Sequence, residues 1–401
     1  MEADRTRPSE GAITKLARGI GSSFDPRRIV AAAIGLMLIR VIAAGLDVLF
    51  RGTASGAPRV SWEFPAAAGD RGIGSFIIAA ALRSLEPVRV VFEPFWGMFA
   101  IGRGTAFFLR SSLASLATII VWSLIGGAIA RIAIVDAAAS RRVGLWEAIR
   151  YVLWKSTPLI GAPLVPILGF FVLALISSPI GLLYRIDSPI AQTIAGVLFV
   201  VPLCIGIVSM LLILGLAIAW PLMPAAIAAE GEDGFDAISR SYGYSSHRTI
   251  RYAILWLIAW IGGAVGAAAA SIVARGVTSL AFWSLGIAAP DSLLLDYWDW
   301  TPDAGLGTAG SAHAFWLSVV ALAAYAWSFA YFWTQAGLIY LILRGEVDGT
   351  PWNDVAAGDR PKIAEAKAKA EAKAKAEPDP AVEKPNRSLR QDHQPDQSSN
   401  E

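Results

Sequence analysis

The sequence contains one cysteine, Cys204, and three histidines among its 401 residues. A single cysteine excludes an internal disulfide, and a zinc-finger site needs several cysteine or histidine ligands at short spacing. The histidines are far apart, at positions 247, 313 and 393, so they form no ligand motif. Because Cys204 lies within an apolar run, we expect it to be a small buried side chain.

Charge is also scarce. Charged residues make up 16% of the chain, whereas soluble domains carry about 25%, and the mean hydropathy is +0.53. Residues 188–229 include no Asp, Glu, Lys or Arg over 42 positions, and about 20 apolar residues suffice to cross a membrane. The sequence therefore predicts an all-α polytopic membrane protein. The net charge of +2 gives no indication of nucleic-acid binding.

Motifs of catalysis are missing as well. The sequence has no phosphate-binding loop, nucleophile motif, paired-histidine metal helix or dinucleotide-binding fingerprint. We accordingly expect no catalytic residue, cofactor or metal ligand, and we favour a protein that is not an enzyme.

Six membrane spans are predicted from the apolar runs that are present. The fourth run would form a helix of about 63 Å, roughly twice the hydrocarbon core, so we place the span after Pro202, with a short helix or loop ahead of it. An apolar piece at 277–289 either extends the fifth span or lies at the interface. The expected spans are residues 29–50, 112–135, 157–183, 203–223, 251–273 and 314–343.

Residues 51–110 are mixed in character. Glu86-Pro87 and Glu93-Pro94 recur seven residues apart, with aromatic residues around them. Helices tend to break before each proline, so the pattern predicts short helices that are either interfacial or re-entrant.

Basic residues predict the orientation. The N-terminal tail, residues 1–28, and the even-numbered loops are basic, whereas the fifth loop is acidic. By the positive-inside rule both termini are cytoplasmic, in a bacterial inner membrane. The long first loop, with seven arginines, is an exception. Residues 9–20 predict an amphipathic surface helix or, alternatively, a solvated tail, and residues 351–401 predict a disordered cytoplasmic tail.

Two cytoplasmic loops share a pattern. Trp146-Glu147-Ala148-Ile149 and Phe235-Asp236-Ala237-Ile238 each read aromatic, acid, Ala, Ile at the start of a short amphipathic helix. Each would form an elbow between two spans, which indicates a parallel repeat of residues 112–183 and 203–273.

These residues resemble a family of uncharacterised bacterial multi-pass inner-membrane proteins. The resemblance covers about residues 80–352, and it implies a helical inner-membrane protein whose activity is not established. The elbow pattern is more loosely similar to the membrane domain fused to some glycerophosphodiester phosphodiesterases. No soluble phosphodiesterase domain is recognised in the sequence, so that activity is not expected here. The matching runs are 126–133, 162–166, 220–223, 230, 235–242, 340–344 and 348–350.

Polar residues at or near membrane depth are the candidate structural or functional residues. Arg40 is expected to face protein or water, and Asp47 to pair with an arginine. Glu230 is expected to pair with Arg131 or Arg240, and a structural pair is favoured over a substrate contact. Gly262 and Gly266 favour close helix packing over a dimer site. The candidates are Arg40, Asp47, Arg131, Asp136, Glu147, Glu230, Asp236 and Arg240.

Three functions are compatible with these features. The leading hypothesis is a non-enzymatic protein of envelope organisation, assembly or membrane homeostasis. The second is a transporter or permease component, which a polar cavity lined by Arg131 and Glu230 would favour. The third is a membrane enzyme acting on lipid. Expected partners are the lipid bilayer and other membrane proteins or a second copy of the chain, with no nucleic acid.

Overall fold

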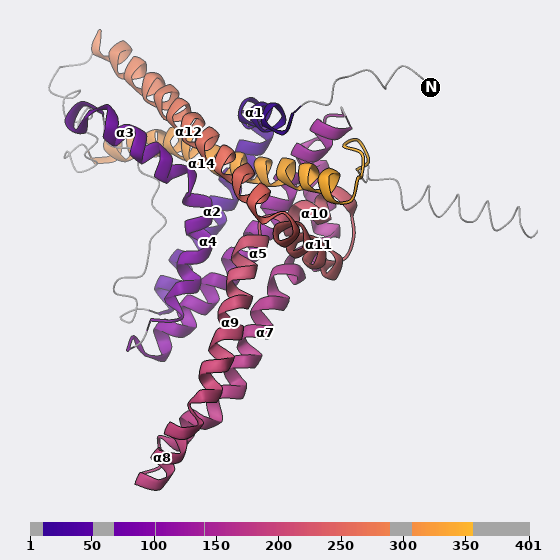
Figure 1. The fold of residues 1–401 in the computed structure, drawn as a ribbon. Helices are drawn as coiled ribbons and strands as arrows, with labels where there is room; N and C mark the ends of the chain where they lie inside the picture. Colours follow the sequence, from indigo (N-terminus) through magenta and orange to yellow (C-terminus); the bar gives the residue numbers. More distant parts are fainter. Residues whose placement is uncertain (1–10, 51–67, 101, 140, 289–306, 356–401) are drawn as a thin grey trace, which may run out of the picture. The chain divides into compact units, whose positions relative to one another are not determined.

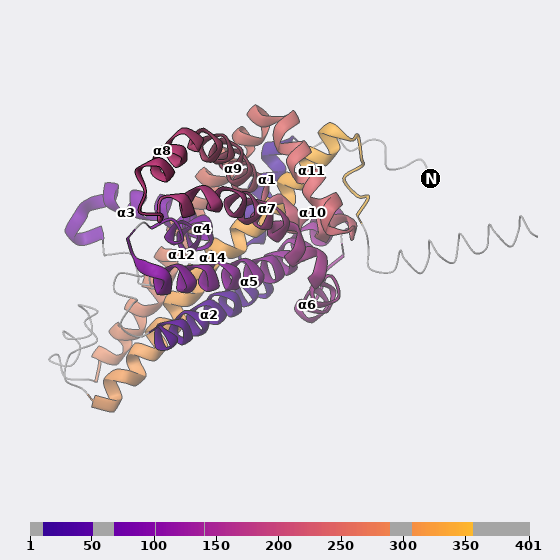
Figure 2. The same cartoon turned by 90° about the horizontal axis from the view of Figure 1, so that it is seen from below.

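The computed structural model describes residues 11–50, 68–100, 102–139, 141–288 and 307–355 (Figures 1 and 2). The described residues form helices joined by short turns. In chain order these are α1 (Ala12–Ser22), α2 (Pro26–Leu49), α3 (Ala68–Ser84), α4 (Glu86–Gly97), α5 (Gly104–Ala138), α6 (Leu145–Trp154), α7 (Ser156–Leu183), α8 (Pro189–Leu198), α9 (Val200–Ala219), α10 (Leu222–Glu230), α11 (Gly234–His247), α12 (Thr249–Gly286) and α14 (Gly307–Val347).

Six of these segments are long and apolar enough to cross a membrane, which confirms the predicted number among the described residues. They are α2, α5, α7, the α8–α9 segment, α12 and the part of α14 from Ala312. The fifth span extends to Gly286, so the apolar piece after residue 277 continues that helix, which is one of the two predicted alternatives. The helices α5, α12 and α14 are longer than the predicted spans, and their added residues include polar and charged ones such as Arg110 and Glu346.

The two elbow helices are confirmed as helices. α6 joins α5 to α7, and α11 joins α10 to α12. The shared pattern has the same burial in both: Trp146 and Phe235 are exposed, whereas Ala148 and Ala237 are buried. The order span, elbow, span fits the predicted repeat, which otherwise stays a prediction. We call the end of the bundle with α6 and α11 the elbow end, and the opposite end, where α5 begins, the far end.

The fourth span departs from its prediction. The break near Pro202 is present, because α8 ends at Leu198 and α9 begins at Val200. The predicted span to residue 223 is wrong, since α9 ends at Ala219 and a separate helix, α10, begins at Leu222. Pro221 and Pro224 supply no N–H for a continuous helix across this point. Residues 222–229 of α10 are all buried, close to the C-terminal part of α14 in Figure 1.

The start of the chain folds onto the bundle. Asp25 caps α2 by accepting a hydrogen bond of 2.9 Å from Arg27 N, and Pro26 occupies the first turn. Leu16 and Gly19 of α1 are buried, and Gln335 Nε2 donates a 3.0 Å hydrogen bond to Leu16 O. The predicted N-terminal helix is therefore present, and it packs on α14.

Aromatic side chains fill the centre of the bundle. Trp122 on α5 stacks on Phe329 of α14, with ring centroids 4.6 Å apart. A Cβ at Gly126 or Gly266 would overlap the indole of Trp333 or Trp327. These glycines therefore let bulky rings approach the helix backbone, and the packing role predicted for the pair Gly262 and Gly266 is met inside the chain.

Two further predictions are wrong. Cys204 is exposed on α9 and not buried. The predicted disordered tail begins too early, because Val355 is buried and Trp352 Nε1 donates a 3.2 Å hydrogen bond to Ala137 O. This bond, the burial of Val355 and a 3.1 Å hydrogen bond from Arg344 to Pro351 O hold residues 351–355 against the bundle. Residues 356–401 lie outside the described part of the chain.

Candidate functional site

Two short helices, α3 and α4, meet part-way along the bundle, against α12 and α14. The two helices meet at Leu85. The end of α3 packs on the middle of α12, where Trp260 Nε1 donates a 3.2 Å hydrogen bond to Ala81 O. The first residue of α4, Glu86, accepts a 3.0 Å hydrogen bond from the Tyr325 hydroxyl of α14. Of the two predictions for this region, the contacts favour the re-entrant one.

The position along the bundle at which α3 meets α4 follows from two ion pairs on α5. Arg110 pairs with Asp47 at 2.5 Å towards the far end, and Asp136 pairs with Arg28 at 3.1 Å towards the elbow end. Arg110 and Asp136 are 26 residues apart (136 minus 110) on the same helix, which is a distance of about 39 Å along the helix axis. Trp122 lies near the midpoint and stacks on Phe329. Tyr325 is one helical turn from Phe329, and it is the hydrogen-bond partner of Glu86. Glu86 therefore lies close to the middle of the bundle.

The charges on α4 form a stripe. Glu86, Arg89 and Glu93 follow a spacing of three and four residues, which places them on one helix face. Arg89 lies 3.1 Å from Glu86 and 3.6 Å from Glu93. The Glu86 side chain is 16% exposed and that of Arg89 is 58% exposed. Charge is costly in hydrocarbon, so such a stripe at membrane depth needs water or protein around it.

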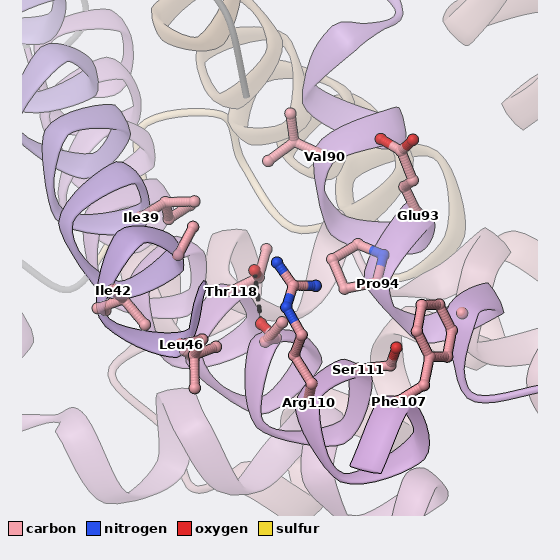
Figure 3. A pocket seen from close by; sticks show the side chains of 14 residues that line it. Ile39, Ile42, Leu46, Val90, Glu93, Pro94, Phe107, Arg110, Ser111 and Thr118 are labelled. Atoms are coloured by element: carbon pink, nitrogen blue, oxygen red, sulfur yellow. Dashed lines mark hydrogen bonds between the residues drawn. The ribbon is translucent and has the colours of Figure 1, made fainter. Parts of the chain in front are cut away.

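A cavity of about 90 Å³ lies between α2, α4 and α5 (Figure 3). It follows α5 from Phe107 to Thr118, about 16 Å of helix. Figure 3 shows Arg110 reaching between the apolar side chains of α2 and the α4 residues Glu93 and Pro94. A water molecule needs about 10–15 Å³ of such space, so the cavity has room for several waters or a small solute. Its polar lining comes from Glu93, Arg110, Ser111 and Thr118.

A second, smaller cavity of about 20 Å³ lies between α4, α5, α7 and α9, with Trp220 at its edge, and its lining is apolar. Neither of these two cavities touches Arg131 or Glu230. The polar cavity at Arg131 and Glu230 that would favour the transporter hypothesis is therefore neither of these two.

At the elbow end, Glu230 lies among cations and a tyrosine. Arg240 approaches Glu230 at 2.7 Å and Arg344 at 3.8 Å, and the Tyr340 hydroxyl donates a hydrogen bond to the same carboxylate. Arg240 also pairs with Glu232 at 2.8 Å. These contacts tie α10 and α11 to α14, which confirms the predicted pair of Glu230 with Arg240.

In the same cluster, the pKa values of Glu232 and Tyr244 are both raised. Burial and the neighbouring Glu230 raise the pKa of Glu232 to about 6, although Arg240 acts in the opposite direction. Burial, followed by the hydrogen bond to Asp348, raises the pKa of Tyr244. The raised pKa moves the change of charge of Glu232 towards neutral pH.

Arg131 has a different partner from the one predicted. Its Nη1 donates a 2.7 Å hydrogen bond to Ala228 O, and its guanidinium lies 4.3 Å from the ring centre of Tyr151. The Tyr151 hydroxyl donates to Ile227 O at 2.8 Å, and Lys155 Nζ donates to Gly231 O at 2.5 Å. The carbonyls at a helix C-terminus carry partial negative charge, so these groups stabilise the end of α10 instead of neutralising Glu230.

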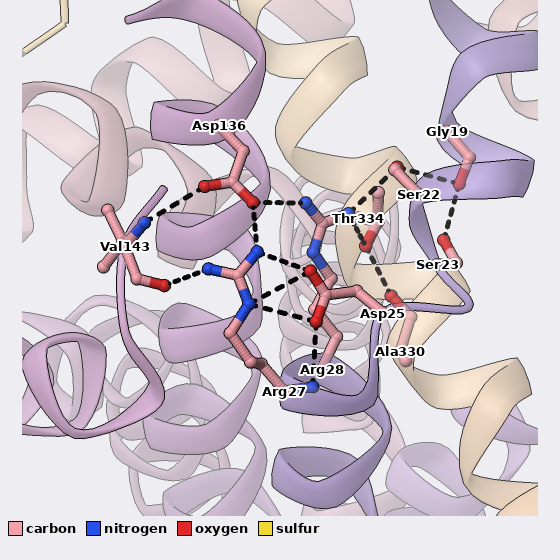
Figure 4. Close-up of polar contacts among 10 residues, drawn as sticks. All are labelled: Gly19, Ser22, Ser23, Asp25, Arg27, Arg28, Asp136, Val143, Ala330 and Thr334. Atoms are coloured by element: carbon pink, nitrogen blue, oxygen red, sulfur yellow. Dashed lines mark hydrogen bonds and ion pairs between the residues drawn. The ribbon is translucent and has the colours of Figure 1, made fainter. Parts of the chain in front are cut away.

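Asp136 joins the start of the chain to α5 (Figure 4). It lies 2.8 Å from Arg27 and 3.1 Å from Arg28, and it accepts a 3.1 Å hydrogen bond from Val143 N. Arg28 is buried and also contacts Ser22. Asp136 is therefore part of a structural cluster separate from Glu230.

The remaining predicted residues are dispersed. Asp47 pairs with Arg110, as expected of a partner arginine. Arg40 is exposed on α2, and the expectation that it faces protein or water stays a prediction. Glu147 pairs with Arg141 at 2.5 Å, and Asp236 is exposed at the start of α11. Within the described residues, Glu230 and Arg240 are thus the only members of the predicted set that form an ion pair with each other.

No protein-family model, curated protein or solved structure matches this chain. The resemblance noted from the sequence stays a prediction. The residues that sequence reasoning missed as a site are Glu86, Arg89, Glu93 and Tyr325. The signal that could have found them is the repeat of Glu-Pro seven residues apart, with an arginine between, in a chain with so little charge.

Proposed function

We propose that this protein is a transporter or permease component for a small polar or ionic solute. The observation that carries the proposal is the position of Glu86, a carboxylate near mid-bundle at the tip of a helix pair that enters from the far end. Ionisable residues at membrane depth typically belong to ion or solute pathways. Helices interrupted inside the membrane commonly form the binding sites of transporters.

The two ends of the bundle differ in a way that supports this proposal. The cavity beside Glu93 and Arg110 lies in the far half. At the elbow end, clusters centred on Asp136 and Glu230 tie the helices together. This arrangement corresponds to a transporter with its elbow end closed. We place the protein in a bacterial inner membrane with the elbow end and both termini in the cytoplasm, on the basis of the loop charges.

A second candidate is the non-enzymatic role in envelope organisation or assembly. The paired elbow-end charges favour it, because a rigid scaffold needs its polar groups paired with one another. Such a protein would use the α3–α4 pair for packing alone. The two candidates differ in whether replacing Glu86 changes solute movement.

The test is charge movement in reconstituted protein. Full-length protein in liposomes would be adsorbed on a solid-supported membrane and exposed in turn to gradients of protons, sodium, potassium, acetate, phosphate and glycine. We expect a current with at least one probe that Glu86→Gln abolishes while the protein stays monodisperse. Glu147→Gln is the matched control, since Glu147 is a carboxylate on the elbow helix, and its current is expected to persist.

Two results would contradict the proposal. One is the absence of current above protein-free liposomes for every probe. The other is a current that survives in well-folded Glu86→Gln. In the first case the scaffold role gains support if crosslinking in native membranes joins the chain to another membrane protein.

A further inference from the structure

The first elbow helix, α6, leaves an amphipathic face uncovered. Its buried side, with Ala148 and Val152, packs towards α5. The opposite side exposes Trp146 at 74% and Trp154 at 66%, with Arg150 between them. The spacing of four residues from 146 to 150 and from 150 to 154 places the three on one helix face.

Cationic groups accompany this face. Residues 141–155 contain Arg141, Arg142, Arg150 and Lys155 against a single acid, Glu147. Glu147 pairs with Arg141, and Lys155 binds Gly231 O. Arg142 and Arg150 are exposed and have no carboxylate partner within the described residues. Two exposed arginines, one on α6 and one just before it, thus lie in the same segment as the two tryptophans.

The second elbow helix provides an internal comparison. α11 begins with the same pattern of exposed aromatic and buried alanine. It is preceded by Glu232 and Asp233 and carries Asp236 in its first turn. The two elbows therefore share their burial and differ in the sign of their charge, so packing alone does not explain the arginines of α6.

The position of α6 along the bundle is that expected of a helix at a membrane surface. The helix follows the elbow end of α5, seven residues after Ala138. Its Tyr151 lies against Arg131, five residues before the Asp136 ion-pair level. Tryptophan is enriched at membrane–water interfaces, and arginine forms strong charge-assisted hydrogen bonds with phosphate.

We propose that Arg142 and Arg150, together with Trp146 and Trp154, form a binding surface for the phosphate headgroup of an anionic phospholipid. The occupant belongs to the leaflet at the elbow end. The tryptophans lie at the boundary between headgroups and acyl chains, and the arginines bind the phosphate and the excess negative charge of the lipid. This inference is independent of whether the protein moves a solute.

Native mass spectrometry of the full-length protein in dodecyl maltoside tests the proposal. The protein would be titrated with phosphatidylglycerol and, separately, with phosphatidylcholine, and bound lipids would be counted. We expect wild type to retain more phosphatidylglycerol. Arg142→Gln/Arg150→Gln should weaken phosphatidylglycerol binding about tenfold or more, since each basic residue near an anionic surface contributes several-fold, with little change for phosphatidylcholine.

Two further variants distinguish this surface from general attraction of anionic lipid to a basic protein. Arg248→Gln removes an exposed arginine at the end of the acidic elbow and is expected to leave phosphatidylglycerol binding unchanged. Trp146→Ala/Trp154→Ala should weaken the binding of both lipids. The proposal is overturned by equal retention of the two lipids in wild type, or by a double arginine variant that binds phosphatidylglycerol like wild type. It is also overturned if the tryptophan variant instead dissociates a dimer.

Discussion

The hydroxyl of Tyr325 donates a 3.0 Å hydrogen bond to the carboxylate of Glu86, joining α14 to the tip of the α3–α4 pair. The two residues are 239 positions apart in the chain. Arg83 of α3 also approaches the Tyr325 ring, with its guanidinium 5.7 Å from the ring centre. Tyr325 thus holds the carboxylate that the proposed function depends on.

Replacing Tyr325 by phenylalanine tests this role. The change removes one hydrogen bond to a charged group while keeping the ring, so we expect a loss of about 1.5–3 kcal/mol in the free energy of unfolding. Unfolding in mixed micelles with increasing denaturing detergent measures it. Tyr184→Phe is a control, because Tyr184 is exposed at the end of α7. A loss no greater than that of the control would show that the hydrogen bond contributes little.

Gly266 tests the close approach of α12 and α14. A Cβ at this position would overlap Trp327, so Gly266→Ala is expected to destabilise the protein by about 1–3 kcal/mol through overpacking. At Gly276, on the same helix, an added Cβ meets no atom within 4 Å. Gly276→Ala should be neutral or stabilising by up to about 1 kcal/mol. Equal melting temperatures for the two variants would contradict the packing of these helices.

Arg131 is expected to be essential for the end of α10. Arg131→Ala leaves the buried carbonyl of Ala228 without its 2.7 Å partner, which should cost about 1–3 kcal/mol or more. Arg142→Ala, an exposed arginine near the same end, should change the unfolding free energy by less than about 0.5 kcal/mol. Thermal unfolding followed by tryptophan fluorescence compares them, and similar values would disprove the capping role.

Glu232 predicts a pH dependence. Its folded pKa of about 6 is above the ordinary value of 4.5, so the folded state binds the proton more tightly than the unfolded state. The stabilising contribution of the protonated group is present below about pH 4.5 and is lost as the pH rises to about 6. Relative to Glu232→Gln, wild type should therefore lose stability across this interval. Melting temperatures of both proteins from pH 4.5 to 7 test this, and parallel curves would refute it.

Orientation can be measured by cysteine labelling. In a Cys204→Ser background, Arg142→Cys should react with an impermeant maleimide only from the cytoplasmic side, and Asp187→Cys only from the opposite side. Both positions are exposed, at the elbow end and at the α7–α8 turn. Labelling of both from one side would rule out the proposed topology.

Several local features were predictable because their causes are local. Apolar length defines a span, so the six spanning segments followed from sequence. The elbow pattern predicted α6 and α11, and the acid in each first turn fits the helix dipole. Pro202 correctly indicated a break, but the break before Leu222 was missed, because proline inside a membrane helix is tolerated wherever neighbours satisfy the backbone.

Partners distant in sequence were not predictable. Glu230 pairs with Arg240, ten residues away, as expected, yet it also binds Tyr340, 110 residues away. Arg131 was one of two arginines expected to pair with Glu230, whereas the structure places it at a helix C-terminus. Such a choice depends on which carbonyls lack a partner once the helices have packed.

The sequence by itself determined that the chain is a helical membrane protein with six spans, two elbow helices and basic residues concentrated in some of its loops. The reason is that hydropathy and the helical periodicity of apolar residues depend only on the residues within each segment. The tertiary structure alone decided that α3 and α4 end against α12 and α14, and that Glu86 reaches Tyr325 near mid-bundle. The physical reason is that a buried charge is stable only where other helices supply polar partners and space for it. Those partners come together only when the bundle has packed.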